Sequence, residues 1–173
     1  MHPLSLFKFC PACGSPHFSE NNSKSKKCAE CGFIYYFNSA AAVAAFITDE
    51  QDRLLVAVRA KDPVKGTLDL PGGFVDMTET AEQAIVREIN EETGLTVAEP
   101  KYIFSLPNDY QYGGFAYQTL DIFFRCKINS NEVVNAEDDV ADLFFVEKKD
   151  LKPELFGLNS IKRAINIWLT NNY

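Results

Sequence analysis

The segment 80–95 constrains the fold of this chain more than any other, because it contains the start signal, the buried face and the stop signal of one helix. Thr80 and Gln83 form a capping-box pattern at its start. Gly94 follows the last turn as a typical stop residue. Between these ends, four apolar side chains recur at helical spacing and predict one buried stripe: Ala81, Ala84, Ile85 and Ile89. The sequence therefore predicts a helix over 81–92 that packs against a sheet.

The second half of this expected helix carries glutamates where a helix alone tolerates them poorly. Glu88 and Glu92 fall within or beside the apolar stripe, and Glu91 lies at its edge. Like charges one turn apart destabilise a helix by roughly 0.2–0.5 kcal/mol, and acidic groups also oppose the negative end of the helix dipole. A divalent cation would reverse both effects, and carboxylates without cysteine or histidine nearby suit Mg²⁺ or Mn²⁺ better than Zn²⁺. On spacing alone, a solvated acidic face explains the same charges.

The rest of the chain after residue 39 mixes strand and helix patterns. Strands are expected at 40–48, 53–60, 66–73, 101–106, 117–128 and 142–147, and a closing helix at 159–172. This closing helix has apolar residues at helical spacing, which predicts a packing role: Ile161, Ala164, Ile165, Trp168 and Leu169. Because the elements do not alternate strictly, we expect an α/β fold with a mixed sheet covered by helices.

The first block of the chain holds four of its five cysteines. Two Cys-x2-Cys-Gly segments, 10–14 and 28–32, match the spacing of a structural zinc site with four thiolate ligands: Cys10, Cys13, Cys28 and Cys31. Two disulfides are the competing interpretation, which a cytoplasmic setting disfavours. With four protein ligands the site would be closed and structural. Cys126 stands alone in an expected strand and is predicted to be core.

Charge and hydropathy limit the classes of partner that the chain is expected to bind. The 173 residues allow one core and a small appendage, and their net charge of −7 disfavours bulk binding to nucleic acid. Lys24, Lys26 and Lys27 are expected in a solvated loop. The longest apolar run, 40–47, is too short to span a bilayer, and the first residues lack the pattern of a signal peptide. We therefore expect a cytoplasmic protein with no membrane partner.

The segment 73–95 resembles the signature of the Nudix hydrolases, G-x5-E-x7-R-E-U-x-E-E-x-G-U with U aliphatic, at every fixed position. Gly73, Glu79 and the run "REINEETGL" carry the match, and the flanking "GTLDLPGGFVD" agrees. Leu68 and Thr78 depart from residues that are frequent in that family. The resemblance implies an α/β/α sandwich over 38–173, preceded by a small zinc ribbon over 1–37.

The resemblance also implies an activity, which is hydrolysis of the pyrophosphate bond in a nucleoside diphosphate linked to another group. ADP-ribose, NADH and sugar nucleotides are the substrate types. Carried onto this chain, the catalytic carboxylates that bind Mg²⁺ or Mn²⁺ are Glu88, Glu91 and Glu92, with the carbonyl of Gly72 or Gly73 as a further ligand. Glu79 and Arg87 are expected to form an orienting salt bridge.

Some members of that family take the proton with an acid from a later loop. The candidates here are Glu137, Asp138 and Asp139, although an acidic turn before a strand would have the same composition. The identity of the general base therefore stays open at this point.

A zinc ribbon before such a domain resembles the layout of the NADH pyrophosphatases. Their S-Q-P-W-P-F-P-x-S array corresponds to 104–117 here, where only Ser105 and Pro107 are retained. Around Gly113-Gly114, aromatic residues suggest a loop near a nucleotide pocket, and hairpin-tip packing is the alternative. The expected substrate-binding residues are Arg59, Tyr110, Tyr112 and Tyr117.

A second hypothesis is a non-catalytic domain that senses a nucleotide, with a ribbon that binds nucleic acid or protein. The intact set of carboxylates favours the enzyme with a small-molecule nucleotide substrate. The layout leaves a homodimer open.

Overall fold

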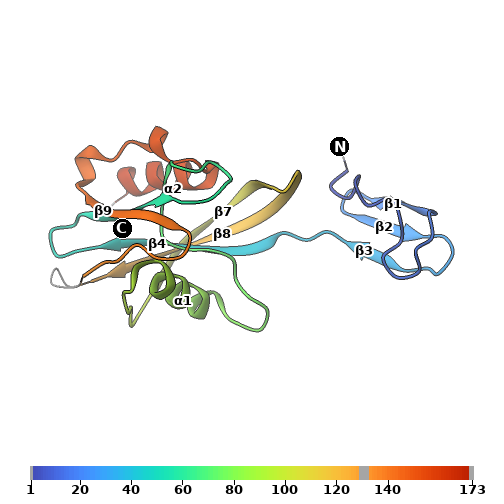
Figure 1. Cartoon of the computed structure of the whole chain (residues 1–173), viewed down its shortest axis with the longest axis horizontal. Coiled ribbons are helices and arrows are strands. Elements are labelled where there is room, and N and C mark those ends of the chain that lie inside the picture. The colour runs from blue at the N-terminus through green and yellow to red at the C-terminus, as the bar shows by residue number, and fades with distance from the viewer. Residues whose placement is uncertain (1, 129–132, 172–173) are drawn as a thin grey trace. The chain divides into compact units, whose positions relative to one another are not determined.

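The computed structural model describes residues 2–128 and 133–171 of the chain. Its contacts divide the chain into two compact units, Met1–Ser39 and Ala40–Tyr173 (Figure 1). In the part of the chain that is described, no helix has the length and apolar character needed to cross a membrane.

The first unit is a small antiparallel sheet with two cysteine-bearing turns. Its strands are β1 (Phe18–Asn22), β2 (Ser25–Cys28) and β3 (Ile34–Tyr36), in the order β1-β2-β3. Gly14 and Gly32 have φ of 75° and 74°, and their N–H groups donate to the carbonyls of Cys10 and Cys28. Glycine permits this left-handed conformation after each second cysteine.

The expected solvated loop at Lys24–Lys27 is wrong for most of its length. Residues 25–28 form β2, and Lys26 is buried, with its Nζ 2.7 Å from the Phe7 carbonyl oxygen and over the Phe18 ring. The lysine stem is long enough to pack as an apolar chain while its ammonium group reaches a backbone acceptor.

The second unit is built on a six-stranded mixed sheet. The strands are β4 (Ala40–Thr48), β5 (Leu54–Arg59), β6 (Leu68–Asp69), β7 (Lys101–Tyr112), β8 (Phe115–Lys127) and β9 (Val140–Val146). The order is β6-β5-β4-β8-β7, and β9 pairs with β5. β4 and β8 run parallel, and the other pairs are antiparallel. Two short 3-10 helices, η1 (Lys148–Asp150) and η2 (Pro153–Leu155), precede the last helix.

The helices α1 (Ala81–Thr93) and α2 (Asn159–Thr170) cover opposite faces of this sheet (Figure 1). Alternate residues of β4 separate two cores, as expected for a strand buried on both faces. Val43, Ala45 and Ile47 pack with α1, whereas Ala44 and Phe46 pack with α2. The α/β/α sandwich with a mixed sheet is therefore confirmed.

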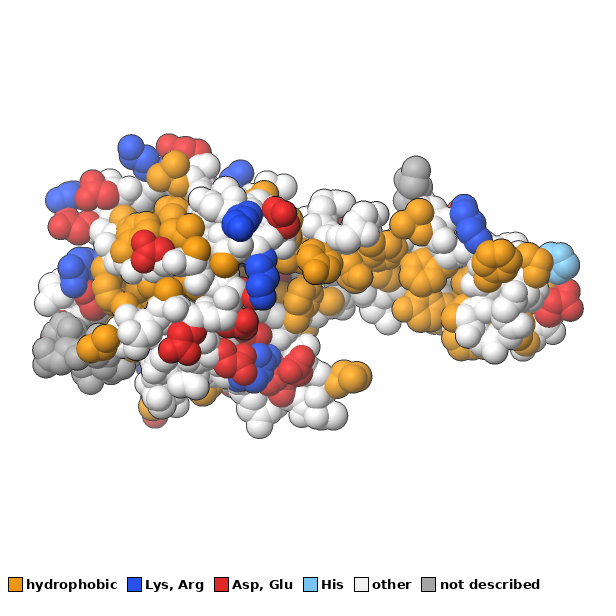
Figure 2. Space-filling view, viewed as in Figure 1, with side chains coloured by type: hydrophobic (Ala, Val, Ile, Leu, Met, Phe, Trp, Pro, Cys, Tyr) orange, Lys and Arg blue, Asp and Glu red, His pale blue; other side chains and the backbone are white. Residues whose placement is uncertain are grey.

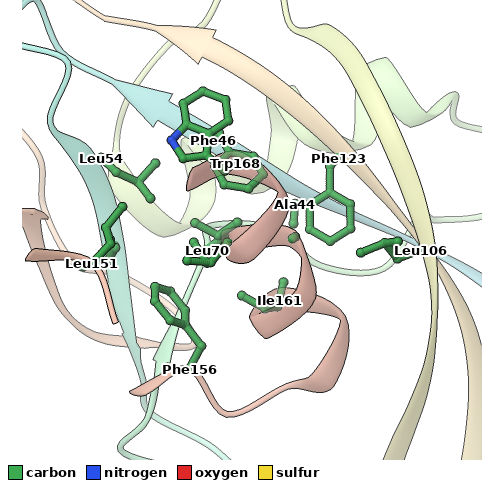
Figure 3. Close-up of a cluster of buried hydrophobic side chains, with 13 residues drawn as sticks. Ala44, Phe46, Leu54, Leu70, Leu106, Phe123, Leu151, Phe156, Ile161 and Trp168 are labelled. Carbon is green, nitrogen blue, oxygen red and sulfur yellow. The ribbon is translucent and has the colours of Figure 1, made fainter. Parts of the chain in front are cut away.

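The α2 core is dense around one aromatic stack (Figure 3). Phe46 and Trp168 have ring centroids 4.4 Å apart and are almost parallel. Ile161, Ala164, Ile165 and Trp168 are buried, so the predicted packing role of the closing helix is confirmed. Cys126 is buried in the α1 core, as expected.

Among the strands of the second unit, β7 extends furthest beyond its predicted segment, and together with β8 it forms one long hairpin. Both strands extend beyond the predicted segments 101–106 and 117–128, until they meet at Gly113-Gly114. These glycines have φ of 58° and 77°, which matches the two-residue turn that favours hairpins. The expected aromatic loop is therefore a hairpin, because paired backbone groups across the ladder outweigh local composition.

The turn between β4 and β5 depends on one buried carboxylate. Asp49 is 4% exposed and accepts hydrogen bonds from the N–H groups of Gln51 and Arg53, at 3.0 and 2.9 Å, and from the Arg53 side chain. Burial acts to raise the pKa of Asp49, but these donors outweigh burial and hold the pKa below its ordinary value.

We expect Asp49→Asn to lower the free energy of unfolding at pH 7 by about 1–3 kcal/mol. A depressed pKa in the folded state means that the contribution is present above the ordinary pKa of about 3.9 and is lost as the pH falls through the lower folded value. Urea unfolding between pH 3 and 7 should therefore show the variant approaching the wild type at acid pH. Asp52→Asn, at an exposed position of the same turn, is the control. A difference that stays constant with pH would contradict the prediction.

Candidate active site

A cleft of about 340 Å³ opens in the second unit and is lined by residues of the sheet and of both helices. Three alanines on β4 and β5 line it: Ala42, Ala44 and Ala57. Their small side chains leave a space that larger residues would fill. The next residue on this face of β4 is Phe46, which packs against Trp168 and does not line the cleft.

Helix α1 brings Glu92 to one end of this cleft. The capping box of Thr80 and Gln83 is formed, and Gly94 ends the helix with φ of 71°, so the local signals fix where the glutamates lie. The carboxylate of Glu92 is buried, and its Oε2 accepts a hydrogen bond of 2.8 Å from the Gly72 N–H. Burial, followed by the charge of Glu88, raises the pKa of Glu92 to about 8, although the Gly72 N–H opposes this shift.

Glu88 and Glu91 lie beside Glu92 in progressively more open surroundings. The Glu88 side chain is 13% exposed, and burial raises its pKa although Arg87 opposes the change. The Glu91 side chain is 47% exposed. All three glutamates line the cleft, so the solvated acidic face does not describe this helix.

Arg87 is the counter-charge of this group. Its Nη1 donates to Glu88 at 2.8 Å and to Glu91 at 3.0 Å, and its Nη2 donates to Glu79 at 2.6 Å and to the Phe74 carbonyl. Figure 2 shows acidic side chains gathered around basic ones over α1. The expected Glu79–Arg87 pair is present in the geometry, and the same guanidinium also joins two of the expected metal ligands.

The backbone at residues 72–73 approaches both the sheet and the glutamates. A Cβ on Gly72, whose φ is 150°, would overlap the Val43 carbonyl oxygen. A Cβ on Gly73 would overlap the carboxylate of Glu88. The Gly73 carbonyl accepts the Val43 N–H at 2.8 Å, which uses one of its two lone pairs.

We expect Gly72→Ala and Gly73→Ala to affect stability differently. The methyl group at residue 72 meets fixed backbone and an unfavourable φ, so the free energy of unfolding should fall by roughly 2 kcal/mol or more. At residue 73 the methyl group meets the movable end of Glu88, so the fall should stay below about 1 kcal/mol. Urea unfolding of both variants measures the difference. Equal losses would contradict this account of the two glycines.

Further charged groups line the cleft. Arg59 lies at the end of β5 and pairs with Asp69 on β6, at 2.5 Å, while its Nε donates to the Pro63 carbonyl. Asp138 and Asp139 stand in the turn before β9, and Lys61 pairs with Asp139. All of these residues except Pro63 line the cleft.

The structure brings together only part of the expected substrate-binding and acidic residues. Tyr110 lines the cleft, with its ring 5.6 Å from that of Phe74. Tyr112 and Tyr117 are exposed on the hairpin and do not line the cleft, and neither does Glu137. Tyr110 pairs with Tyr117 across the ladder and Tyr112 lies two residues further along β7, so all three tyrosines share one face of the hairpin, but only Tyr110 lies close enough to line the cleft.

Sequence reasoning missed a polar group on the β7 and β8 wall: Asn108, Thr119 and Asp121. All three are buried. Asp121 accepts hydrogen bonds from the hydroxyl groups of Thr119, at 2.6 Å, and Ser160. A signal was available in the sequence of β8. Thr119 and Asp121 are polar, yet they lie on the same face of this strand as the core residue Phe123.

The four cysteines of the first unit converge. Their sulfur atoms all lie within 4.8 Å of one another, with Cys10–Cys31 and Cys13–Cys28 both at 3.7 Å. A disulfide would need about 2.0 Å, whereas tetrahedral ligands about 2.3 Å from zinc lie about 3.8 Å apart. Backbone N–H groups of Cys31 and Glu30 lower the pKa of Cys28 to about 6, whereas at Cys13 the Ser15 N–H opposes the shift but the neighbouring thiols raise the pKa to about 12.

The glutamates are not drawn as close together as the cysteines. Within residues 2–128 and 133–171, the four cysteines are the one group of three or more histidine, cysteine or acidic side chains drawn this close together. Glu88 and Glu91 instead share the Arg87 guanidinium. Arg87 contacts one oxygen of each of these carboxylates, Glu88 Oε1 and Glu91 Oε2, and each carboxylate has a second oxygen with which it could bind a cation.

Comparisons with known proteins identify relatives of this chain. The family model described as NUDIX domain matches residues 38–169. The chain is 30% identical to the NAD-capped RNA hydrolase NudC of Pseudomonas aeruginosa over 158 residues, which are 91% of this chain and 54% of the relative. It is 33% identical to an ADP-ribose pyrophosphatase of Methanocaldococcus jannaschii over 135 residues, which cover 77% of this chain and 76% of that one.

The solved structures agree on the fold. A NUDIX hydrolase from Nitrosomonas europaea matches with a TM-score of 0.75 and 20% identity, over 94% of this chain and 90% of that chain. The NUDIX domain of NrtR from Shewanella oneidensis, solved with ADP ribose, matches with a TM-score of 0.62 and 17% identity, over 76% of this chain and 86% of that one. The chain spans about half the length of the NudC relative.

Proposed function

The chain belongs to the NUDIX domain family, and on that premise we propose that it hydrolyses the pyrophosphate bond of a nucleoside diphosphate linked to a further group, with Mg²⁺ or Mn²⁺. The observation that carries the proposal is the placement of Glu88, Glu91 and Glu92 on one end of a cleft, beside the backbone of Gly72 and Gly73. Three carboxylates at that position match the hard oxygen ligands that these cations prefer.

The glutamates fit a divalent cation by charge and by space. Burial and mutual repulsion disfavour the ionised form of Glu92, and a cation would remove that penalty. Gly73 lacks the side chain that would displace Glu88, so carboxylate and backbone can serve one ion. A bound divalent cation supplies a Lewis acid for the phosphate oxygens and lowers the pKa of a water molecule.

The remaining roles follow from contacts. Glu88, Glu91 and Glu92 hold the cation and assist removal of the proton from the attacking water. Arg87 orients two of them through its Nη1 while Glu79 fixes its other nitrogen atoms. Asp138 and Asp139 also line the cleft, in the turn whose Glu137 N–H donates to the Glu92 carbonyl, and are the second candidates for the general base.

The names of the relatives define the range of substrates to test. They include an ADP-ribose pyrophosphatase and NAD-capped RNA hydrolases. The molecules in these names, ADP-ribose and the NAD cap, both contain a pyrophosphate joined to a nucleoside. We propose ADP-ribose, NADH or a sugar nucleotide as the substrate class of this chain. NAD-capped RNA belongs in the same test because of the NudC name, although the net charge of −7 disfavours a long polyanion.

For the first unit, we propose a structural Zn²⁺ bound by Cys10, Cys13, Cys28 and Cys31. The sulfur separations of 3.7 Å and the closed set of four ligands support this assignment.

The decisive experiment incubates the chain with ADP-ribose, NADH, sugar nucleotides and NAD-capped RNA, with Mg²⁺ or Mn²⁺, and identifies the products. Release of a nucleoside monophosphate together with the phosphorylated partner group is expected. Tight binding of a nucleotide without turnover of any substrate would instead support a sensing domain.

A further inference from the structure

Asn108 is a polar side chain buried in the wall of the cleft without a complete set of partners. It is 7% exposed, and its Oδ1 accepts no hydrogen bond from any residue that the structure describes. A buried acceptor without a partner costs roughly 1–3 kcal/mol, so it calls for a functional explanation. The other such atom in the described residues, Thr48 Oγ1, does not line the cleft.

The surroundings of Asn108 do not supply the missing donor. Thr119, which faces Asn108 across the β7–β8 ladder, donates its hydroxyl group to Asp121. The Ser160 hydroxyl group donates to the other oxygen of Asp121. Both nearby hydroxyl groups are therefore used, and both carboxylate oxygens of Asp121 are occupied.

The position of Asn108 indicates which part of a substrate it meets. The glutamates that would bind the cation occupy the α1 end of the cleft, so the diphosphate belongs there. An amide oxygen is an acceptor and does not suit a phosphate oxygen, which is also an acceptor. Asn108 therefore suits a neutral part of the substrate that carries an N–H or O–H donor.

The aromatic pair next to Asn108 favours a planar group. Phe74 and Tyr110 line the cleft with ring centroids 5.6 Å apart at 88°, and Phe74 is 42% exposed. Among planar groups, adenine matches an asparagine amide in both directions, because Oδ1 accepts from N6–H while Nδ2 donates to N7. The χ2 torsion of asparagine is broad, so a small rotation turns the amide toward the cleft.

We propose that Asn108 is a specificity-determining residue that recognises the amino-bearing edge of an adenine base, an inference that rests on the proposed function. Phe74 and Tyr110 form the apolar side of the same subsite. The Asn108 amide gains its missing partner when the base binds.

The test compares ADP-ribose with the hypoxanthine analogue IDP-ribose, in which a carbonyl replaces the amino group. The wild type should prefer ADP-ribose in kcat/KM by about tenfold to a hundredfold. Asn108→Leu should reduce this ratio to about 1. Because the variant removes an unsatisfied acceptor and keeps a similar shape, its melting temperature should equal or exceed that of the wild type. Asn108→Ala tests the same loss with a smaller side chain.

The control is Gln111→Ala, at an exposed position of the same strand that does not line the cleft. It should keep the ADP-ribose preference of the wild type. An equal preference for both nucleotides in the wild type, or an unchanged ratio in both Asn108 variants, would overturn the inference even if hydrolysis is observed.

If the wild type hydrolyses no nucleotide of the substrate panel, the proposed function fails, and calorimetric binding of ADP-ribose and IDP-ribose with Mn²⁺ decides the inference separately. A wild-type preference for ADP-ribose in Kd that disappears in Asn108→Leu would support recognition of adenine. Equal Kd values, or no binding of either nucleotide, would overturn it.

Discussion

Replacement of Glu92 by glutamine is expected to lower the kcat for Mg²⁺-dependent or Mn²⁺-dependent hydrolysis by about 10²–10⁴-fold. Glu92 is the most buried of the three glutamates, and its carboxylate is fixed by the Gly72 N–H at the end of the cleft. Glutamine keeps the shape and one acceptor but loses the charge that a cation requires. Steady-state kinetics with the best nucleotide of the substrate panel measures the effect.

We expect the Glu92→Gln variant to be folded and at least as stable as the wild type. In the absence of divalent cations, the raised pKa of about 8 means that ionisation of Glu92 destabilises the folded state progressively as the pH rises from about 4.5 to about 8. The variant lacks this penalty, so its melting temperature should match or exceed that of the wild type, most clearly at the upper end of this range. Mg²⁺ or Mn²⁺ should raise the melting temperature of the wild type more than that of the variant.

Glu82→Gln is the matched control, because Glu82 lies exposed in the first turn of the same helix and does not line the cleft. Its kcat should remain within twofold of the wild type, in line with a surface change. Full activity in Glu92→Gln, or a fall in activity that follows a loss of folded protein, would remove the basis for the metal site.

Removal of zinc is expected to unfold the first unit while the second unit stays folded. The buried core of the first unit contains Cys10, Phe18 and Cys28, which is too small to stabilise a sheet without a cross-link. Structural zinc contributes about 10–16 kcal/mol of binding free energy, and this binding is coupled to folding. A strong chelator, or Cys31→Ser in the full chain, should therefore expose residues 1–39 to protease.

The measurements are zinc content by mass spectrometry and limited proteolysis. The wild type should carry one zinc per chain, and Cys31→Ser should carry none. Cys126→Ser is the control, because this cysteine is buried in the second unit and is not one of the four converging cysteines. A zinc-free chain whose first 39 residues resist protease would contradict a structural metal site.

Local sequence signals were sufficient to predict those elements whose structure depends on residues close together in the chain. The helix α1 was predicted because Thr80, Gln83 and Gly94 act within one turn of its ends, and the observed helix differs by one residue at its end. The strand β4 was predicted with the observed bounds because its apolar run is buried on both faces. The cysteine spacing likewise indicated a group whose sulfur atoms do converge.

Other features depend on partners that are distant in sequence. The strands of the first unit were not predicted, because polar residues such as Ser25 and Lys26 enter a sheet only through cross-strand pairs. The importance of Asn108 depends on its register opposite Thr119 and on the Ser160 hydroxyl group, which reaches Asp121 from α2. No periodicity in the sequence reports such a missing partner.

The sequence by itself determined which chemical groups are present: an α1 helix with glutamates on an inward face, and four cysteines at the spacing of a metal site. It could do so because helix geometry fixes the relative directions of residues a few positions apart. Only the tertiary structure decided that the Gly72 N–H reaches the Glu92 carboxylate, and that alanines of β4 and β5 leave a cleft beside the glutamates. These contacts join segments far apart in the chain, so their distances follow from packing of the whole domain and not from local propensity.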